Sequence, residues 1–270
     1  MEPRHDQWNP GMIIGARLDV AAIVVEGPDA RRYLHSQMSN DVESIPVGGS
    51  RQSLLLEPTG KVVAITRVWR EDEERCAVLV EAGRTDVADA VETRLRRFLI
   101  RTKATITRGS IEVTRLISTD GSAIVVDDHS THLAWWEDGG VHDVIGVPFA
   151  GLDGCVMVDQ DAIEVARVAA GWPANGSEVI AGETVPASLG VVPVTVSFTK
   201  GCYPGQELVE RMDSRGATAP RTLRMIDGAG RAVGDTVLVA GAPVGVITSV
   251  AGDVALAFVD RSCELGSIRE

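Results

Sequence analysis

The order of apolar and polar positions predicts a succession of short strands and a few helices. The first helix follows a strand-like run, and its apolar residues recur at helical spacing: Ala30, Tyr33, Leu34 and Met38. Pro28 favours the first helical position, with Asp29 in the first turn, and the helix is expected to stop near residues 40–41. Apolar runs on either side of the Pro-Thr-Gly at residues 58–60 predict two strands joined by a tight turn.

Two further helices have clear signals at their ends. The apolar stripe of the first consists of Val87, Val91, Leu95 and Phe98. Thr85 is its expected cap, because a hydroxyl can accept a hydrogen bond from the first free backbone N–H groups. The second helix is expected to start at Asp159 as cap and to end at Gly171, with Pro173 just beyond.

The remaining apolar, β-branched runs predict strands. In the main part of the chain they cover residues 75–82, 111–118, 123–127 and 192–200. Near the C-terminus they are shorter and separated by Gly, Asp and Pro, at residues 221–227, 235–241, 242–250 and 252–260. Strands and helices mix without regular βαβ alternation, and no G-x-G-x-x-G occurs. The expected class is therefore α+β, with a main body in residues 1–215 and a small β-barrel in residues 216–270.

Composition narrows the classes of function. The 270 residues carry a formal net charge of −12, which disfavours binding to a nucleic-acid backbone. No apolar stretch reaches the length of a membrane span, and the first residues lack a secretory pattern, so a cytoplasmic protein without a membrane partner is expected. A basic cluster is expected to form a solvated helix face, and it consists of Arg94, Arg96, Arg97, Arg101 and Lys103.

Four widely spaced cysteines are present, and no C-x-x-C motif occurs, so no self-contained metal or dithiol site is predicted. Apolar neighbours favour buried packing for Cys76 and Cys155, and the surroundings of Cys263 indicate nothing specific. Only Cys202 lies in polar, turn-like sequence, in the stretch TKGCYPGQELVER. This cysteine is the main candidate for chemistry.

Two interpretations of Cys202 are open from its local sequence. Pro204 fits the first position of a helix that continues through residues 205–212, so the thiol is expected at the helix N-terminus, where free N–H groups and the helix dipole stabilise a thiolate. Lys200 adds a cation two residues away, which also favours the thiolate. The alternative is a turn in which a small Cys packs under a strand. The local sequence supports the two interpretations about equally.

The residues KGCYPGQE, Lys200 to Glu207, resemble the K-G-C-Y-x-G-Q-E signature of the YgfZ family, with every fixed position met. Residues 27–42, 54–69, 166–173 and 242–250 resemble other segments of that family. The resemblance implies a fold like the T-protein (aminomethyltransferase) of the glycine cleavage system. Such a fold has two intertwined α/β lobes around a central opening, followed by a β-barrel.

The same resemblance implies a function and its residues. It implies a tetrahydrofolate or a derivative as ligand, and iron–sulfur enzymes or assembly proteins as partners. Cys202 would act as a nucleophilic or cluster-contacting thiolate, tuned by Lys200. The edge of the folate pocket would be shaped by Tyr203, Gly205, Gln206 and Glu207.

Two departures from the T-protein pattern bear on activity. An acidic pair in its hairpin strand is replaced here by Ala64 and Ile65, so aminomethyl transfer is expected to be absent or to need another acid. A pterin-binding Glu is replaced by Ala169. Arg167 could hold a folate carboxylate or, as the commoner arrangement, pair with Glu164 at i,i+3.

Weaker candidates and three hypotheses complete the prediction. Asn40 and Asp41 could line the folate pocket or could terminate a helix. The first hypothesis is a YgfZ-type accessory protein that supports iron–sulfur enzymes. The second is a folate-dependent aminomethyltransferase or other one-carbon transferase, and the third is a scaffold that has lost the ligand. No metal ligand set is predicted.

Overall fold

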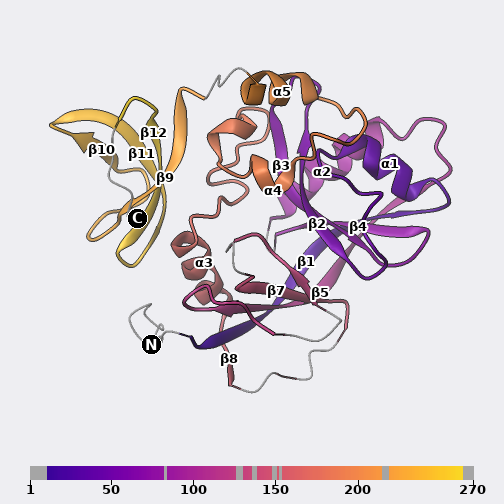
Figure 1. Cartoon of the computed structure of the whole chain (residues 1–270), viewed down its shortest axis with the longest axis horizontal. Coiled ribbons are helices and arrows are strands. Elements are labelled where there is room, and N and C mark those ends of the chain that lie inside the picture. Colours follow the sequence, from indigo (N-terminus) through magenta and orange to yellow (C-terminus); the bar gives the residue numbers. More distant parts are fainter. Residues whose placement is uncertain are drawn as a thin grey trace.

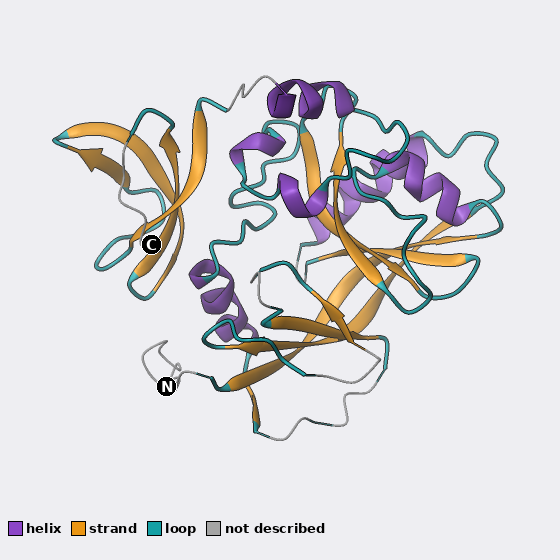
Figure 2. Cartoon of the chain, in the orientation of Figure 1, coloured by secondary structure: helices purple, strands orange, loops and turns teal. Residues whose placement is uncertain are grey.

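The computed structural model describes residues 11–81, 84–125, 130–135, 139–147, 151, 154–214 and 219–263. Strands outnumber helices and are gathered into two sheets (Figures 1 and 2). The predicted α+β class is confirmed. Each helix within these ranges is too short or too polar to cross a bilayer.

The larger sheet has eight strands in the described residues, and β1 runs through its middle. Its strands are β1 (Ile13–Glu26), β2 (Ser50–Leu56), β3 (Val62–Arg70), β4 (Arg75–Val80), β5 (Thr105–Ser118), β6 (Ser130–His132), β7 (Val141–Ile145) and β8 (Cys155–Met157). They lie in the order β2-β3-β4-β1-β5-β7-β6, and β8 pairs with β1 in parallel. Because β1 and β5 pair antiparallel over fourteen residues, they connect the two halves of the sheet.

Helices cover the two faces of this sheet. They are α1 (Ala30–Gln37), α2 (Thr85–Arg97), α3 (Gln160–Ala169), α4 (Val192–Thr195), α5 (Gln206–Ser214) and a 3₁₀ turn at Pro186–Ser188. Side chains alternate along β1, so that Ile23 and Val25 pack on the side of α1 and α2. Val20, Ala22 and Val24 face the other core, which also holds residues of the segment after α3.

The C-terminal sheet contains the four strands that the sequence predicts. They are β9 (Arg221–Asp227), β10 (Thr236–Val239), β11 (Ala242–Ala251) and β12 (Val254–Asp260), in the order β10-β11-β12-β9. This sheet stands beside the main body and packs on α3 (Figure 1), where Val168 meets Ala251 and Leu256. The division at residues 215–216 stays a prediction, because that boundary lies outside the described residues.

Both helices that were expected to start at a proline start two residues later. The first begins at Ala30 rather than Pro28, and α5 begins at Gln206 rather than Pro204. The reason at α5 is Gly205, whose φ of +87° lies in the left-handed region and cannot be part of a right-handed helix. The first helix ends at Gln37, slightly before the predicted stop.

The strand predicted over residues 192–200 is wrong. The segment starts with the short helix α4, in which Val196 N–H donates to the carbonyl of Val192. Pro193 lies in its first turn, where the missing N–H of proline has no cost, so the turn overrides the β-branched composition. Ala123 to Val125 are not in a strand either, and the rest of the run over residues 123–127 lies outside the described residues.

The helix caps are only partly as predicted. Asp159 caps α3 by accepting a hydrogen bond from the N–H of Ala162 at 3.2 Å, and Gly171 follows the helix with a φ of +73°. Thr85 is not a cap. It is the first residue of α2, and the preceding Arg84 makes no capping hydrogen bond with its side chain.

Arg94 departs from the expected solvated face. Its guanidinium is buried and donates to the Leu56 carbonyl at 3.0 Å and to Gln37 Oε1 at 3.2 Å, and it lies over the Phe98 ring. The other four basic residues of that cluster are exposed, as expected. Cys76 is buried as predicted, whereas Cys155 is only partly buried.

Candidate functional site

The loop of residues 199–205 is fixed to the C-terminal end of α1 by Lys200. The Lys200 ammonium donates to the backbone carbonyls of His35 and Met38, the latter at 2.7 Å. Carbonyls at the end of a helix lack partners within the helix, so they are natural acceptors for a lysine. Burial lowers the pKa of Lys200 to about 8, even though Asp41 and Glu43 act in the opposite direction.

The glycine of the motif packs against the turn between β2 and β3. At Gly205 a methyl group would lie only 2.6 Å from the Glu57 carbonyl oxygen and 2.9 Å from the Cα of Gly60. Gly60 itself has a φ of +85° and lies against Leu208 of α5. Two backbones therefore meet with no room for a side chain at either glycine, which is the local reason for both residues.

Gln206 holds the cysteine side of the loop. Its Oε1 accepts from the Tyr203 N–H at 2.9 Å, and its Nε2 lies 3.8 Å from the Cys202 sulfur as a donor. Tyr203 is buried in the main core, which raises the pKa of its hydroxyl to about 12, and its ring lies 4.9 Å from the Lys200 ammonium. Glu207, in the first turn of α5, is exposed.

Cys202 is exposed at the surface of this loop. Three residues separate it from the start of α5, so the predicted position at the helix end is shifted outward. It reaches the helix through the side chain of Gln206. The thiol is therefore accessible, beside a partly buried amine on a loop fixed at three points.

Asn40 and Asp41 organise the chain after α1. The Asn40 amide donates to the carbonyls of Gln52 and Val194 at 2.9 and 3.0 Å, and so ties β2 to α4. Asp41 accepts from the N–H of Ser44, and this hydrogen bonding lowers the pKa of its carboxyl although partial burial opposes the change. Neither residue lines the cavities described below.

Arg167 is part of a buried polar cluster between α3 and the C-terminal sheet. Its guanidinium pairs with Glu164, as the i,i+3 spacing predicts, and with the fully buried Glu178 at 3.4 Å. It also donates to Ser249 Oγ at 2.9 Å, and Ser249 in turn donates to Glu178 at 2.7 Å. The carbonyl of Trp172 accepts another of its hydrogen bonds. Arg167 therefore joins α3, the following segment and β11.

Three cavities meet at Trp172 and Pro173, in the centre of the molecule. The largest has a volume of about 1130 Å³ and lies between the main body and β9, with Ala169 and Arg224 in its lining. The others are about 270 Å³ and 30 Å³. The family motifs imply a central opening but do not identify its two tryptophans, Trp135 and Trp172, because isolated aromatic residues are ordinary core residues in a sequence.

A buried ionic network forms one wall of the two smaller cavities. Asp143 is fully buried and accepts from Arg67 at 2.6 Å and from Arg115 at 2.9 Å. Burial alone would raise the pKa of Asp143, but Arg115 and Arg67 hold it below its ordinary value. Arg115 also pairs with Glu81 at 3.3 Å and lies 4.7 Å from the Trp135 ring.

Two buried donors beside this network have no hydrogen-bond partner among the described residues. They are Arg67 Nη1, at the 30 Å³ cavity, and Trp135 Nε1, at the two larger ones. A buried donor without an acceptor costs about 1–3 kcal/mol, so each of these atoms needs an acceptor from a ligand or a water molecule.

The positions of the missing acidic pair are filled by packing. Ala64 is fully buried and Ile65 nearly so. The Asn175 side chain bonds both the N–H and the carbonyl of Ile65, each at 2.9 Å. Neither position presents a carboxylate to the cavities, as the sequence predicts. Within the described residues no group of three or more His, Cys, Asp and Glu side chains could hold a metal ion.

The fold defines the class of protein first. Aminomethyltransferase T of the glycine cleavage system from Bartonella henselae matches with a TM-score of 0.72 over 95% of this chain and 80% of that one, at 17% identity. The fold is therefore that of the T-protein, and the predicted fold is confirmed. No family model matches the sequence.

Sequence relatives then narrow the class. The tRNA-modifying protein YgfZ of Klebsiella pneumoniae is 26% identical over 74% of this chain and 67% of its own length. An uncharacterized protein of Haemophilus influenzae is 28% identical over 72% and 66%. A mitochondrial iron–sulfur cluster assembly factor IBA57 homolog of Phaeosphaeria nodorum is 25% identical over 74% and 52%. The matches thus span about half to two thirds of these relatives. They confirm the resemblance to the YgfZ family and support assignment to it, with a T-protein-like fold.

Proposed function

We propose that this protein is a YgfZ-type accessory factor that binds a reduced folate and supports iron–sulfur cluster assembly or repair through Cys202. The observation that carries the proposal is an exposed thiol on a loop held by Lys200, Gly205 and Gln206. Such a loop presents one sulfur to a partner at low entropic cost, because the backbone around it is already ordered.

The names of two relatives support a role in iron–sulfur cluster assembly or repair. One is a tRNA-modifying protein and another an iron–sulfur cluster assembly factor. One cysteine cannot complete a cluster site, because such sites normally take four ligands. We therefore infer that Cys202 acts together with a partner protein or a small thiol and that the chain does not hold a cluster alone.

The central cavities offer a folate two kinds of contact: free hydrogen-bond donors and aromatic side chains. Trp135 would donate to a carbonyl or carboxylate oxygen of the ligand, since its N–H has no acceptor within the described residues. The 30 Å³ cavity at Arg67 has room for about one water molecule, which could bridge Arg67 to the ligand. Trp172 and Trp135 offer aromatic surface to a pteridine or benzoyl ring. The chemical role of a reduced folate is to carry one-carbon units.

The residues at the positions of the T-protein carboxylates disfavour aminomethyl transfer by this protein. Ala64, Ile65 and Ala169 occupy the positions of the T-protein carboxylates, and none of them can orient an amine or accept a proton. We infer that a bound folate serves a role other than glycine-type turnover. A negative assay with glycine, sarcosine and dimethylglycine is the expected result.

Replacement of Cys202 tests the proposal. Cys202→Ala should abolish support of iron–sulfur enzymes in cells that lack their own relative of this protein, with aconitase activity as the readout. Cys263→Ala is the matched control and should retain full support. The purified Cys202→Ala protein should unfold at the wild-type urea concentration, because an exposed sulfur contributes little to stability. Wild-type support by this variant would refute the role of Cys202.

A further inference from the structure

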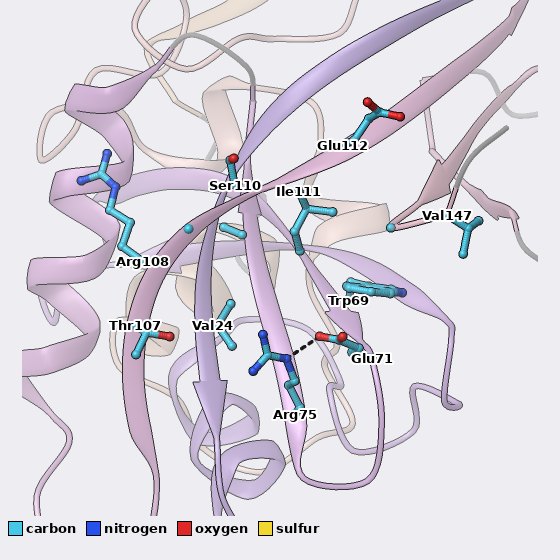
Figure 3. Close-up of a pocket in the computed structure, with 13 residues that line it drawn as sticks. Val24, Trp69, Glu71, Arg75, Thr107, Arg108, Ser110, Ile111, Glu112 and Val147 are labelled. Atoms are coloured by element: carbon cyan, nitrogen blue, oxygen red, sulfur yellow. Dashed lines mark hydrogen bonds and ion pairs between the residues drawn. The ribbon is translucent and has the colours of Figure 1, made fainter.

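A second groove, separate from the central cavities, lies on the face of the large sheet opposite α1 and α2. It has a volume of about 560 Å³ and runs beside β5 (Figure 3). Small residues form its floor, at Ala22 and Gly109, and Trp69 and Val147 form one wall. It shares no lining residue with the three cavities that meet at Trp172.

Within the described residues, one edge of β5 is unpaired along this groove. On its other edge β5 pairs with β1 over all fourteen residues, but β7 covers only Val113–Ile117. Two hydrogen bonds mark the ends of the open stretch. The Gly146 N–H donates to the Glu112 carbonyl at 3.1 Å, and Arg96 Nη2 donates to the Ile106 carbonyl at 2.7 Å.

The backbone between these two ends is available for pairing. Alternate residues of an antiparallel strand direct both N–H and C=O to the same edge, so Arg108 and Ser110 face the same way as Ile106 and Glu112. No hydrogen bond to these backbone groups of Arg108 and Ser110 occurs within the part of the chain that the structure describes. Both residues are exposed, and an open edge of this kind is a template for another strand.

The groove offers space for side chains of an added strand. A Cβ built at Gly109 would meet no atom within 4 Å, so the strand is bare at that position. The Trp69 ring is held across the groove, where a Cβ at Gly146 would come within 3.1 Å of it. An apolar side chain from a neighbouring strand could therefore cover Gly109 and contact Trp69, a known way to stabilise glycine in strands.

The charges at the groove favour a cationic partner. Arg75 pairs with Glu71, and Arg108 pairs with Asp89, so these charges are already balanced. Glu112 is exposed and has no ion pair within the described residues. The unbalanced charge at the groove is thus negative, in a chain whose formal net charge is −12.

We propose that this open edge of β5 binds an extended peptide segment of a partner protein. The segment adds a strand by pairing with the backbone of Arg108 and Ser110. An apolar side chain of the segment covers Gly109, and a Lys or Arg one position away lies beside Glu112. This alternation follows from the two faces of a strand.

A labelled model peptide tests the proposal on the full chain. The probe is a fluorescein-labelled octapeptide of alternating lysine and valine with one central phenylalanine, and the control probe carries N-methyl groups on alternate residues, which remove its pairing N–H groups. The first should bind at least tenfold more tightly by fluorescence anisotropy. Equal binding of the two probes would overturn the proposal.

Three substitutions on β5 locate the binding. Gly109→Phe fills the groove and should weaken binding at least tenfold. Thr105→Phe places the same ring at an exposed position of β5 outside the groove and should change it less than threefold. Circular dichroism checks the fold of both. Glu112→Gln, which leaves the groove open, should weaken binding and reduce its dependence on salt. Unchanged affinity in both Gly109→Phe and Glu112→Gln would contradict the assignment.

The alternative occupant is a second copy of this chain. Sedimentation of the wild type would then give a dimer that Gly109→Phe converts to monomer, and this result would overturn the peptide proposal. A monomer in both forms, with peptide binding only in the wild type, supports it.

Discussion

Gly205 shows what the family motif requires of a single residue. Its φ is +87°, and a methyl group at this position would lie 2.6 Å from the Glu57 carbonyl oxygen, so no side chain fits. Gly205→Ala should therefore lower the free energy of unfolding by about 2–3 kcal/mol. Gly201→Ala, four residues earlier in open space, should cost less than about 0.5 kcal/mol. Urea unfolding of the two variants measures both values, and equal losses would contradict the steric explanation.

The lowered pKa of Lys200 predicts how the stability of the protein depends on pH. Its pKa is about 8 in the folded chain and 10.5 as the reference value, so between these values the unfolded chain binds more protons. Stability therefore receives an increasing contribution from this group as pH rises from about 8 to 10.5. Lys200→Met should lose that contribution. Lys61→Met is the control, because the Lys61 ammonium makes only an exposed hydrogen bond to the Glu183 carbonyl.

Urea unfolding between pH 7 and 10.5 measures the contribution of Lys200. The quantity of interest is the difference in unfolding free energy between wild type and Lys200→Met, because other groups that titrate in this range cancel in it. That difference should grow with pH. A difference independent of pH would show that the Lys200 ammonium is not desolvated in the folded protein.

At the scale of elements, Arg167 links α3 to β11 through Glu178 and Ser249. Arg167→Met removes the cation and leaves the fully buried Glu178 unbalanced, which should cost about 3–5 kcal/mol. The C-terminal strands should then exchange amide hydrogens faster than the main sheet. Arg221→Met breaks only an exposed pair with Asp260 and should cost less than about 1 kcal/mol. Equal effects would mean that the cluster does not hold the two sheets together.

The elements also show where sequence reasoning succeeds. The four C-terminal strands and the helix capped by Asp159 follow from local patterns, since alternation and end signals act within a few residues. The strand predicted over residues 192–200 is wrong because a helical turn at Pro193 overrides the β-branched composition. The prediction that Arg94 is exposed is wrong because its burial depends on acceptors at Leu56 and Gln37, which are far away in the sequence.

At the scale of the whole molecule, the proposed binding of tetrahydrofolate can be tested at the central cavities. Trp135→Phe removes the N–H that has no partner among the described residues but keeps an aromatic ring, so it should weaken tetrahydrofolate binding by about 1.4 kcal/mol, or about tenfold. Trp69→Phe lies in the other groove and should leave binding unchanged. Calorimetry with tetrahydrofolate measures both. Absence of heat and of a thermal shift with the wild type would favour a scaffold without ligand.

The sequence by itself determined the α+β class, the T-protein-like fold through its motifs, and the absence of carboxylates at Ala64, Ile65 and Ala169. These follow from residue types and their spacing, which need no knowledge of distant contacts. Only the tertiary structure decided that Cys202 is exposed, that Arg167 also pairs with the buried Glu178, and that one edge of β5 is unpaired within the described residues. Exposure and pairing depend on which distant segments meet, and chain order does not encode that locally.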